Sequence, residues 1–141
     1  MGDDPWKGYG GDDLPCHHPV FVLTCHPREP LEMLGGTTFH FVADGIEPTL
    51  EQARAAACGK DVSLDGGANV VQQYPAADLL DEMLISVVPV LLGGGARLSG
   101  SLGEPKPRLR PTQVVEAPGV THAGMCAKWR RDRAQAVTEG W

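Results

Sequence analysis

The stretch DVSLDGGANV, residues 61–70, decides the fold that this sequence predicts. Asp61–Leu64 has the pattern of a short β-strand, and the Gly66-Gly67 pair marks a tight turn. A segment with helical spacing of apolar residues begins near Ala68. A strand that runs through glycines into a helix is a building unit of α/β proteins, so the sequence predicts that fold class.

The helix after this turn carries apolar residues at helical spacing from Val70 to Leu80, but Pro75 lies inside it. A proline at that place removes one backbone hydrogen bond, and its ring clashes with the carbonyl of Val71. The cost is about 3 kcal/mol or more. We therefore expect this helix to kink or to end early at Pro75.

Two strands and a helix are predicted before residue 60. Val20–Thr24 and Thr38–Val42 are rich in β-branched and aromatic residues, which is typical of strands. Pro48 suits a first helical position, and Gly59 stands where a helix would terminate. Between them, apolar residues recur at helical spacing, so a helix is expected there.

After the second helix the sequence predicts a buried strand and a closing hairpin. Leu84–Leu92 is continuously apolar, which is typical of a strand covered on both faces. Three prolines are expected to keep residues 99–111 from regular structure. Gln113–Ala117 and Ala123–Trp129 are expected to pair as a hairpin around Pro118-Gly119.

These elements together predict an α/β domain in which helices cover the faces of a mixed sheet. Its expected bounds are residues 19–129. Residues 1–18 contain acidic residues, glycines and prolines without periodicity, and are expected to form a loose arm. Residues 130–141 are polar and are expected to form a tail that frays or makes a short helix.

Length, charge and composition exclude several classes of protein. A chain of 141 residues suffices for one domain with a real core. Its net charge of −6 and its pI near 5.2 argue against a nucleic-acid partner. The longest apolar run is shorter than the roughly 20 residues of a membrane span, and residues 1–6 lack a signal-peptide pattern. We therefore expect a cytoplasmic protein without a membrane partner, whose four cysteines are reduced.

The glycine turn is the first candidate site. Gly66 and Gly67 let backbone N–H groups approach an anion, and a helix that begins at Ala68 and Asn69 adds about half a positive charge. A phosphate or pyrophosphate is therefore a suitable ligand for these four residues. The alternative is a strand-to-helix connection whose glycines only supply a positive φ. The carboxylate of Asp65 beside the turn also disfavours an anion.

Thr24, His26 and Arg28 follow the first predicted strand and form the second candidate site. At the carboxyl edge of a sheet, such groups bind an adenosine ribose and its 2′-phosphate, with Arg28 as the bidentate ligand. The alternative is a solvated turn that carries one charge.

Cysteines and histidines around the first strand suggest a zinc site as a third possibility. They are Cys16, His17, His18, Cys25 and His26. If the strand is extended at about 3.3 Å per residue, His18 and Cys25 lie roughly 23 Å apart, too far to share an ion. The sequence also has no C-x-x-C spacing, so we expect no metal site.

Seven short segments form a recognisable series. They are HHPVFVLT (17–24), PRE (27–29), FHFV (39–42), LEQA (50–53), GGA (66–68), LDE (80–82) and PVLLGGG (89–95). In this order they resemble the dihydrofolate-reductase-like family, and more specifically the reductase domain at the C-terminus of the bifunctional riboflavin-biosynthesis deaminase-reductase. The most specific part is Leu80–Gly95, and the likeness dissolves after His122.

The resemblance implies a three-layer α/β/α fold that binds NADPH and passes a hydride to a pyrimidine- or pterin-like substrate. It also assigns roles to three groups of residues. Thr24, His26 and Arg28 would face the adenosine 2′-phosphate; Gly66, Gly67, Ala68 and Asn69 would hold the pyrophosphate; Gly93 and Gly94 would border the substrate cleft.

The sequence departs from that family at its beginning, because related reductases have an N-terminal strand and helix before the matching segments. We therefore expect a fold without this strand and helix, and an aminouracil-type reductase that is impaired by truncation. The alternative is a catalytically silent nucleotide-binding or self-associating module, for example a homodimer, because an exposed strand edge can accept another strand. No residue is assigned as general acid or base.

Overall fold

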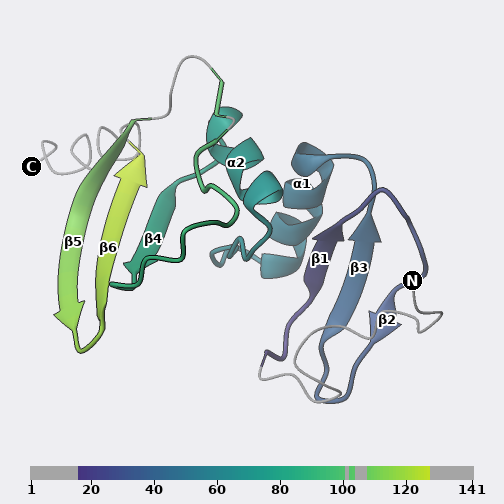
Figure 1. Cartoon of the computed structure of the whole chain (residues 1–141). Helices are drawn as coiled ribbons and strands as arrows, with labels where there is room; N and C mark the ends of the chain where they lie inside the picture. The colour runs from purple at the N-terminus through teal and green to yellow at the C-terminus, as the bar shows by residue number, and fades with distance from the viewer. Residues whose placement is uncertain (1–15, 101, 104–107, 128–141) are drawn as a thin grey trace, which may run out of the picture. The chain divides into compact units, whose positions relative to one another are not determined.

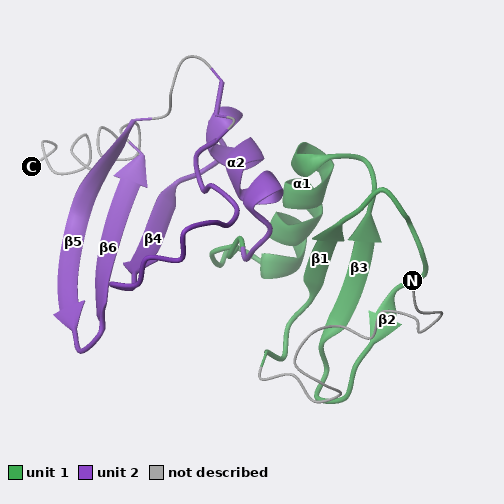
Figure 2. Ribbon diagram, viewed as in Figure 1, with its two compact units in different colours: residues 1–64 green, residues 65–141 purple. Residues whose placement is uncertain are grey.

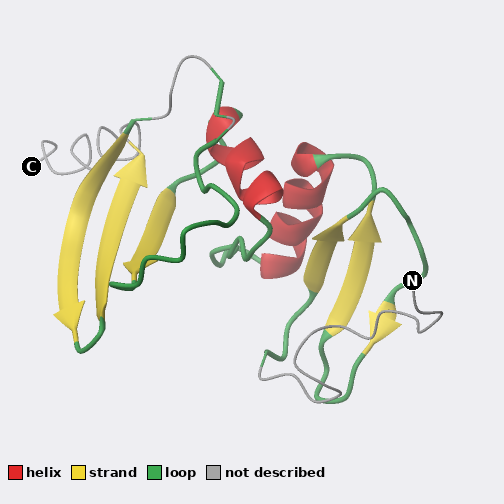
Figure 3. Cartoon of the chain, in the orientation of Figure 1, coloured by secondary structure: helices red, strands yellow, loops and turns green. Residues whose placement is uncertain are grey.

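The structure is a computed structural model that describes residues 16–100, 102–103 and 108–127. It divides into two compact units, residues 1–64 and 65–141 (Figure 2). The loose arm expected at residues 1–18 falls outside the described residues except for Cys16–His18, and so does the tail expected at 130–141. The described elements are six strands and two helices (Figure 3), which confirms the α/β class.

Unit 1 contains a small mixed sheet with the strand order β1-β3-β2 (Figure 1). Strand β1, Val20–Leu23, runs parallel to β3, Thr38–Val42, and pairs from Val20 with Phe39 to Leu23 with Val42. The two-residue strand β2, Leu31–Glu32, is antiparallel to β3. Both strands predicted in this region are confirmed. Their β-branched and aromatic residues favour extended backbone.

Strand β3 supplies most of the core of unit 1. Phe39 is 1% exposed and Val42 is also buried, and the two side chains point to opposite faces because they are three residues apart in a strand. Both faces of β3 are therefore covered at these positions. Thr37, just before the strand, is buried too, and its hydroxyl donates a hydrogen bond to the backbone carbonyl of Cys16.

Helix α1, Ile46–Ala57, packs against β1. Pro48 is its third residue, where a missing N–H costs nothing because the first turn has no intrahelical acceptors. Cys58, with a φ of 50°, and Gly59, with a φ of 86°, adopt positive φ values and end the helix. The predicted helix and its end near Gly59 are both confirmed.

The strand predicted at Asp61–Leu64 is wrong, because residues 61–67 carry no helix or strand. A strand exists only where a neighbouring strand accepts and donates its backbone hydrogen bonds. In the described part of the chain no strand pairs with this segment. The local pattern therefore predicted an extended backbone but not its partner.

Helix α2, Ala68–Ala76, begins directly after the glycine pair in unit 2. Pro75 is its penultimate residue, and the helix ends one residue later, well before Leu80. Leu79 donates its N–H to the carbonyl of Tyr74 at 2.9 Å and so closes the turn after the helix. The early end expected from Pro75 is confirmed.

Tyr74 is buried in α2, as is Pro75, and burial raises the pKa of its phenol above the ordinary value of 10.0. As pH rises through about 10, the phenol therefore ionises more readily in the unfolded chain than in the folded one. We expect the free energy of unfolding to fall between about pH 9 and about pH 11, and Tyr74→Phe to reduce that fall. Denaturant unfolding of the parent and of Tyr74→Phe at the two pH values measures the change in free energy of unfolding. An equal fall in both proteins would contradict the prediction.

The sheet of unit 2 is antiparallel, with the strand order β4-β6-β5. Its strands are β4, Glu82–Val87, β5, Leu109–Ala117, and β6, Val120–Ala127. Strands β5 and β6 form the hairpin predicted around Pro118-Gly119, and Gly119 supplies the positive φ of 77° in the turn. The hairpin is confirmed for the residues that the structure describes.

Two expectations for this region are wrong. Strand β4 ends at Val87, and Leu84, Leu91 and Leu92 are 71%, 102% and 83% exposed, so Leu84–Leu92 is not a strand covered on both faces. An apolar run is buried only where a layer of structure covers it. Residues 99–111 are expected to be irregular throughout, but strand β5 already begins at Leu109. Pro111 is tolerated because β5 is an edge strand with an irregular register at that point.

Candidate functional site

The first candidate cluster lies at the carboxyl edge of the sheet in unit 1. Thr24 follows β1 directly, and its N–H donates to the carbonyl of Val42, the last residue of β3, at 3.0 Å. The hydroxyl of Thr24 accepts a hydrogen bond from the N–H of His26 at 3.0 Å. This bond fixes the turn that carries His26 and Arg28 away from the strand.

Arg28 returns over the sheet from this turn. Its guanidinium carbon lies 4.1 Å from the centroid of the Phe41 ring on β3, and the side chain is exposed. A cation above an aromatic face is stabilised by about 0.5–1 kcal/mol at an exposed site. Phe41 therefore provides a platform that holds an exposed guanidinium at the carboxyl edge of β3.

The N-terminus of α1 lies at the same edge, because β3 ends at Val42 and α1 begins at Ile46. Its N-cap is Gly45, with a φ of 96°, and no side chain caps the first turn. The uncapped N–H groups favour an anion. The carboxylates of Asp44 and Glu47 oppose that preference. At this edge we therefore expect an anion to be attracted by Arg28 rather than by the start of α1.

The second candidate cluster is the start of α2 in unit 2. Gly66 has a φ of 69°, and the N-cap Gly67 has φ 68° and ψ 109°. No side chain makes a capping hydrogen bond, and the first turn holds no acidic residue. A Cβ at Gly66 would meet nothing within 4 Å, and one at Gly67 only Val70 Cγ2 at 3.9 Å. The positions of the missing Cβ atoms at this helix start are therefore open, and the helix has no side-chain cap.

Asn69, the second residue of α2, does not cap the helix. Its side-chain oxygen accepts a hydrogen bond from the amide of Gln73, one turn later, at 2.8 Å. Ala68 is half-buried and Asn69 is exposed. The side chains at this end thus leave the N-terminal N–H groups to an external acceptor.

The glycine-rich loop after β4 contains Gly93 and Gly94, and both are exposed. Gln72 on α2 donates a side-chain hydrogen bond to the carbonyl of Arg97 at the far end of this loop. A Cβ at Gly100 would lie 3.6 Å from Arg97 Cβ and 3.9 Å from the Gln72 amide nitrogen. Gln72 therefore ties the loop to the helix that begins at Gly67. Sequence reasoning missed Gln72, because an amide on a helix carries no signal of such a contact.

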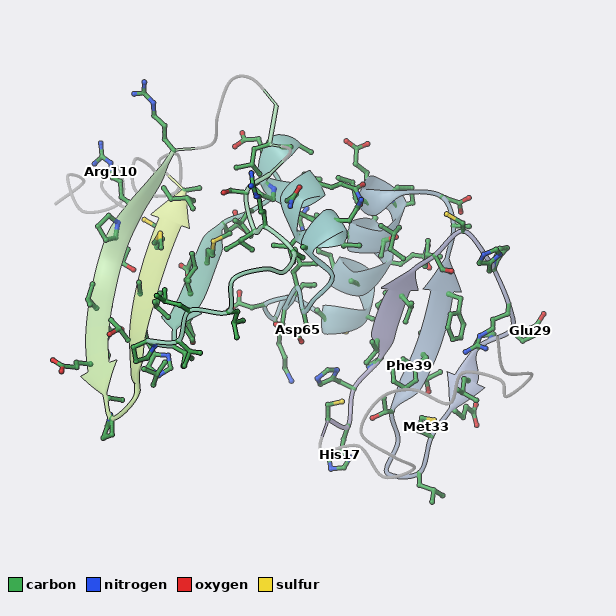
Figure 4. The ribbon with its side chains drawn as sticks, viewed as in Figure 1. His17, Glu29, Met33, Phe39, Asp65 and Arg110 are labelled. Carbon is green, nitrogen blue, oxygen red and sulfur yellow. The ribbon has the colours of Figure 1, made fainter. Side chains whose placement is uncertain are left out.

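The structure brings the predicted residues together in two groups. Thr24, His26 and Arg28 form one turn of unit 1, with Phe41 as an added member. Gly66, Gly67, Ala68 and Asn69 form the start of α2 in unit 2, and Gln72 on the same helix bonds to Arg97, which follows Gly93 and Gly94 in their loop. Figure 4 labels the residue next to each group. Glu29 follows Arg28 in unit 1, and Asp65 precedes Gly66 at the start of α2.

The cysteines and histidines of the metal hypothesis take other roles. The Nδ1 atom of His17 lies 2.7 Å from the carbonyl oxygen of Gly35, and all four cysteines are unpaired thiols. Within residues 16–100, 102–103 and 108–127, no three His, Cys, Asp or Glu side chains are grouped to hold a metal ion. In the same residues neither helix is long and apolar enough to cross a membrane.

Two further histidines lie within the sheets. The ring of His40 stacks on that of Phe21, with centroids 5.0 Å apart and an interplanar angle of 18°. The Nδ1 atom of His122 lies 2.9 Å from the hydroxyl of Ser86 on the neighbouring strand. Both contacts fit packed sheet residues.

A comparison with protein families and curated proteins gives two matches. The family model described as the RibD C-terminal domain matches residues 2–123. The curated protein YwjB of Bacillus subtilis (strain 168) is 39% identical over 56 residues, which cover 39% of this chain and 32% of YwjB.

Similar solved structures include a riboflavin biosynthesis protein and a RibD protein. A putative riboflavin biosynthesis protein from Shewanella sp. PV-4 is 28% identical with a TM-score of 0.67, covering 82% of this chain and 64% of its own. RibD of Acinetobacter baumannii is 22% identical with a TM-score of 0.52, covering 66% of this chain and 27% of its own. The chain thus spans less than two thirds of these proteins. The second likeness shows the fold alone.

Proposed function

The chain belongs to the RibD C-terminal domain family, whose reductase-like fold it shares, and on that premise we propose that it is an NADPH-dependent reductase. Its substrate class is a pyrimidine- or pterin-like small molecule of the aminouracil-reductase type. The observation that carries this proposal is the start of α2, where two glycines with positive φ expose an uncapped helix N-terminus. A pyrophosphate is the anion that such a terminus would bind in a dinucleotide.

The residues of this helix start fit a pyrophosphate in two respects. Gly66 and Gly67 have no side chain to exclude a large anion, and open space surrounds the positions of their missing Cβ atoms. Ala68 and Asn69 contribute N–H groups of the first turn that have no intrahelical acceptor. Asp65, immediately before Gly66, limits the affinity by repulsion, and the helix dipole has to outweigh it.

Arg28 supports the choice of NADPH over NADH. The guanidinium above Phe41 is exposed, carries a full charge and can donate two parallel hydrogen bonds to a phosphate. His26 and Thr24 would add an imidazole and a hydroxyl from the same turn. We assign these three residues to the adenosine 2′-phosphate.

NADPH supplies the hydride when it is bound, so the protein's own task is orientation and exclusion of water. Gly93 and Gly94 would border the substrate, because a loop without side chains lets a flat ring approach the backbone closely. The hydrogen bond from Gln72 to Arg97 would hold this loop against α2. No side chain is assigned a proton-transfer role.

Isothermal titration calorimetry of the full chain with NADPH and NADH tests the cofactor assignment. We expect saturable binding of NADPH, and weaker binding of NADH because it lacks the 2′-phosphate. Loss of NADPH absorbance with an aminouracil substrate then tests reduction. NADPH binding without turnover would support the silent nucleotide-binding module, and no binding of either dinucleotide would refute the proposed function.

A further inference from the structure

The glycine loop, residues 88–97, is fastened to the rest of unit 2 by one side chain. All of these residues are exposed and carry no helix or strand. Among the described residues, the loop takes part in two hydrogen bonds: the N–H of Val90 donates to the carbonyl of Val88 at 2.8 Å, and the Gln72 amide donates to the carbonyl of Arg97. The first bond is internal to the loop. Gln72 is therefore the residue that holds the loop to α2.

Helix α2 carries Gln72 close to the N–H groups that we assign to the pyrophosphate. The helix begins at Ala68, so Gln72 lies about one turn after its first residue. The neighbouring Gln73 uses its amide differently, because it donates within the helix to the side-chain oxygen of Asn69 at 2.8 Å. Of these two adjacent glutamines, Gln72 bonds to the loop and Gln73 bonds within α2.

The first turns of α2 depend on what binds at its N-terminus. The helix has nine residues, no side-chain cap and a proline as its penultimate residue. Helices shorter than about 12–15 residues are marginal by themselves, and the N–H groups of a first turn need a cap or a ligand to accept their hydrogen bonds. An anion at this terminus would supply the missing acceptors. It would thereby stabilise the turn that carries Gln72.

We propose that Gln72 is a positioning residue that couples the pyrophosphate site to the glycine loop. An anion at the start of α2 strengthens the hydrogen bond from Gln72 to Arg97, and so holds Gly93 and Gly94 in place for the substrate. The coupling rests on the proposed function and adds an order to it, because the cofactor prepares the substrate site before the substrate binds. Coupling between two sites is reciprocal, so the held loop strengthens anion binding by the same factor.

Cleavage by trypsin after Arg97 measures how often the loop is released. A serine protease binds the carbonyl oxygen of the bond that it cleaves in its oxyanion hole, and here the Arg97 carbonyl accepts the hydrogen bond from Gln72. We therefore expect cleavage between Arg97 and Leu98 to require release of Gln72, at a rate that follows the fraction of open loop. Cleavage after Lys60, which is exposed in unit 1, is the internal reference.

Three variants test the hydrogen bond in the absence of ligand. Gln72→Ala removes the donor, and Gln72→Glu replaces it with an acceptor of nearly the same size. Both should speed cleavage after Arg97 by about threefold to tenfold relative to cleavage after Lys60. Gln73→Ala is the matched control, because it removes an amide that bonds to Asn69 within α2, and it should leave the rate unchanged. Alanine favours helix, so both alanine variants keep α2.

Two ligands then test the coupling. Saturating NADPH, and in a separate experiment inorganic pyrophosphate, should slow cleavage after Arg97 about fivefold in the parent and in Gln73→Ala. Neither ligand should slow it in Gln72→Ala, because the link to the loop is missing. By reciprocity, the dissociation constant of NADPH measured by calorimetry should be about fivefold higher for Gln72→Ala than for Gln73→Ala.

The results distinguish the coupling from the proposed function. If NADPH binds but does not protect the bond after Arg97, or protects it equally in Gln72→Ala, the coupling is refuted and the cofactor assignment stands. If pyrophosphate protects this bond through Gln72 while NADPH does not bind, the coupling stands and the proposed function is refuted. Binding of neither ligand refutes both. Equal cleavage of Gln72→Ala and Gln73→Ala without ligand refutes the coupling alone.

Discussion

Replacing Gly67 with aspartate should lower the affinity for NADPH about a hundredfold or more, which corresponds to about 2.8 kcal/mol. Two effects act together. Gly67 has φ 68° and ψ 109°, a conformation that costs a residue with a side chain about 1–3 kcal/mol. The new carboxylate also stands at the N-terminus of α2, where it would repel a pyrophosphate. Calorimetric titration with NADPH measures the loss.

Gly119→Asp is the matched control for this variant. Gly119 also has a positive φ, 77°, and a Cβ there would meet nothing within 4 Å, but it lies in the turn between β5 and β6. The variant therefore also places a carboxylate at a glycine with positive φ in the same unit, without touching the start of α2. We expect it to bind NADPH as the parent does. If Gly67→Asp does so too, the pyrophosphate assignment is wrong.

Arg28→Ala should weaken NADPH binding by about tenfold to a hundredfold, and NADH binding by less than about threefold. A charge-assisted hydrogen bond to a phosphate contributes about 1.5–3 kcal/mol, and only NADPH offers a phosphate at the adenosine 2′ position. The ratio of the two dissociation constants, measured by calorimetry, isolates this contribution. Equal losses for the two dinucleotides would refute the 2′-phosphate role.

Two variants separate the charge of Arg28 from its placement. Arg54→Ala removes a positive charge from the last turn of α1 in the same unit, and should leave the preference for NADPH intact. Phe41→Leu keeps the charge of Arg28 but removes the ring beneath its guanidinium, 4.1 Å away. An intermediate loss for Phe41→Leu would show that the platform orients the cation. A loss with Arg54→Ala as large as that with Arg28→Ala would show a general effect of charge.

The elements that could be predicted from the sequence are those set by local pattern. The extended backbone of Thr38–Val42 could be predicted because β-branched and aromatic side chains favour it. Helix α1 has Pro48 in its first turn, two residues after its start at Ile46, and ends just before Gly59, and α2 stops just after Pro75. In each case the deciding interaction joins residues within a few positions of each other.

The failures share a different cause. Asp61–Leu64 has strand-like residues but no partner strand among the described residues, and Leu84–Leu92 is apolar but largely uncovered. Whether such a segment becomes a strand, or is buried, depends on residues far away in the chain. Pro111 in β5 shows the same dependence, because only an edge position lets a proline remain in a sheet.

The same distinction between local and long-range interactions applies to the candidate site. The amino-acid sequence alone determined the glycine pair, the helix that follows it, and the threonine, histidine and arginine after β1, because each depends on backbone preference over a short span. Tertiary structure alone decided that Phe41 lies beneath Arg28, that Gln72 holds the glycine loop, and that β4 is an open edge. These are contacts between distant segments, and their free energy depends on which surfaces the folded chain brings together or leaves uncovered.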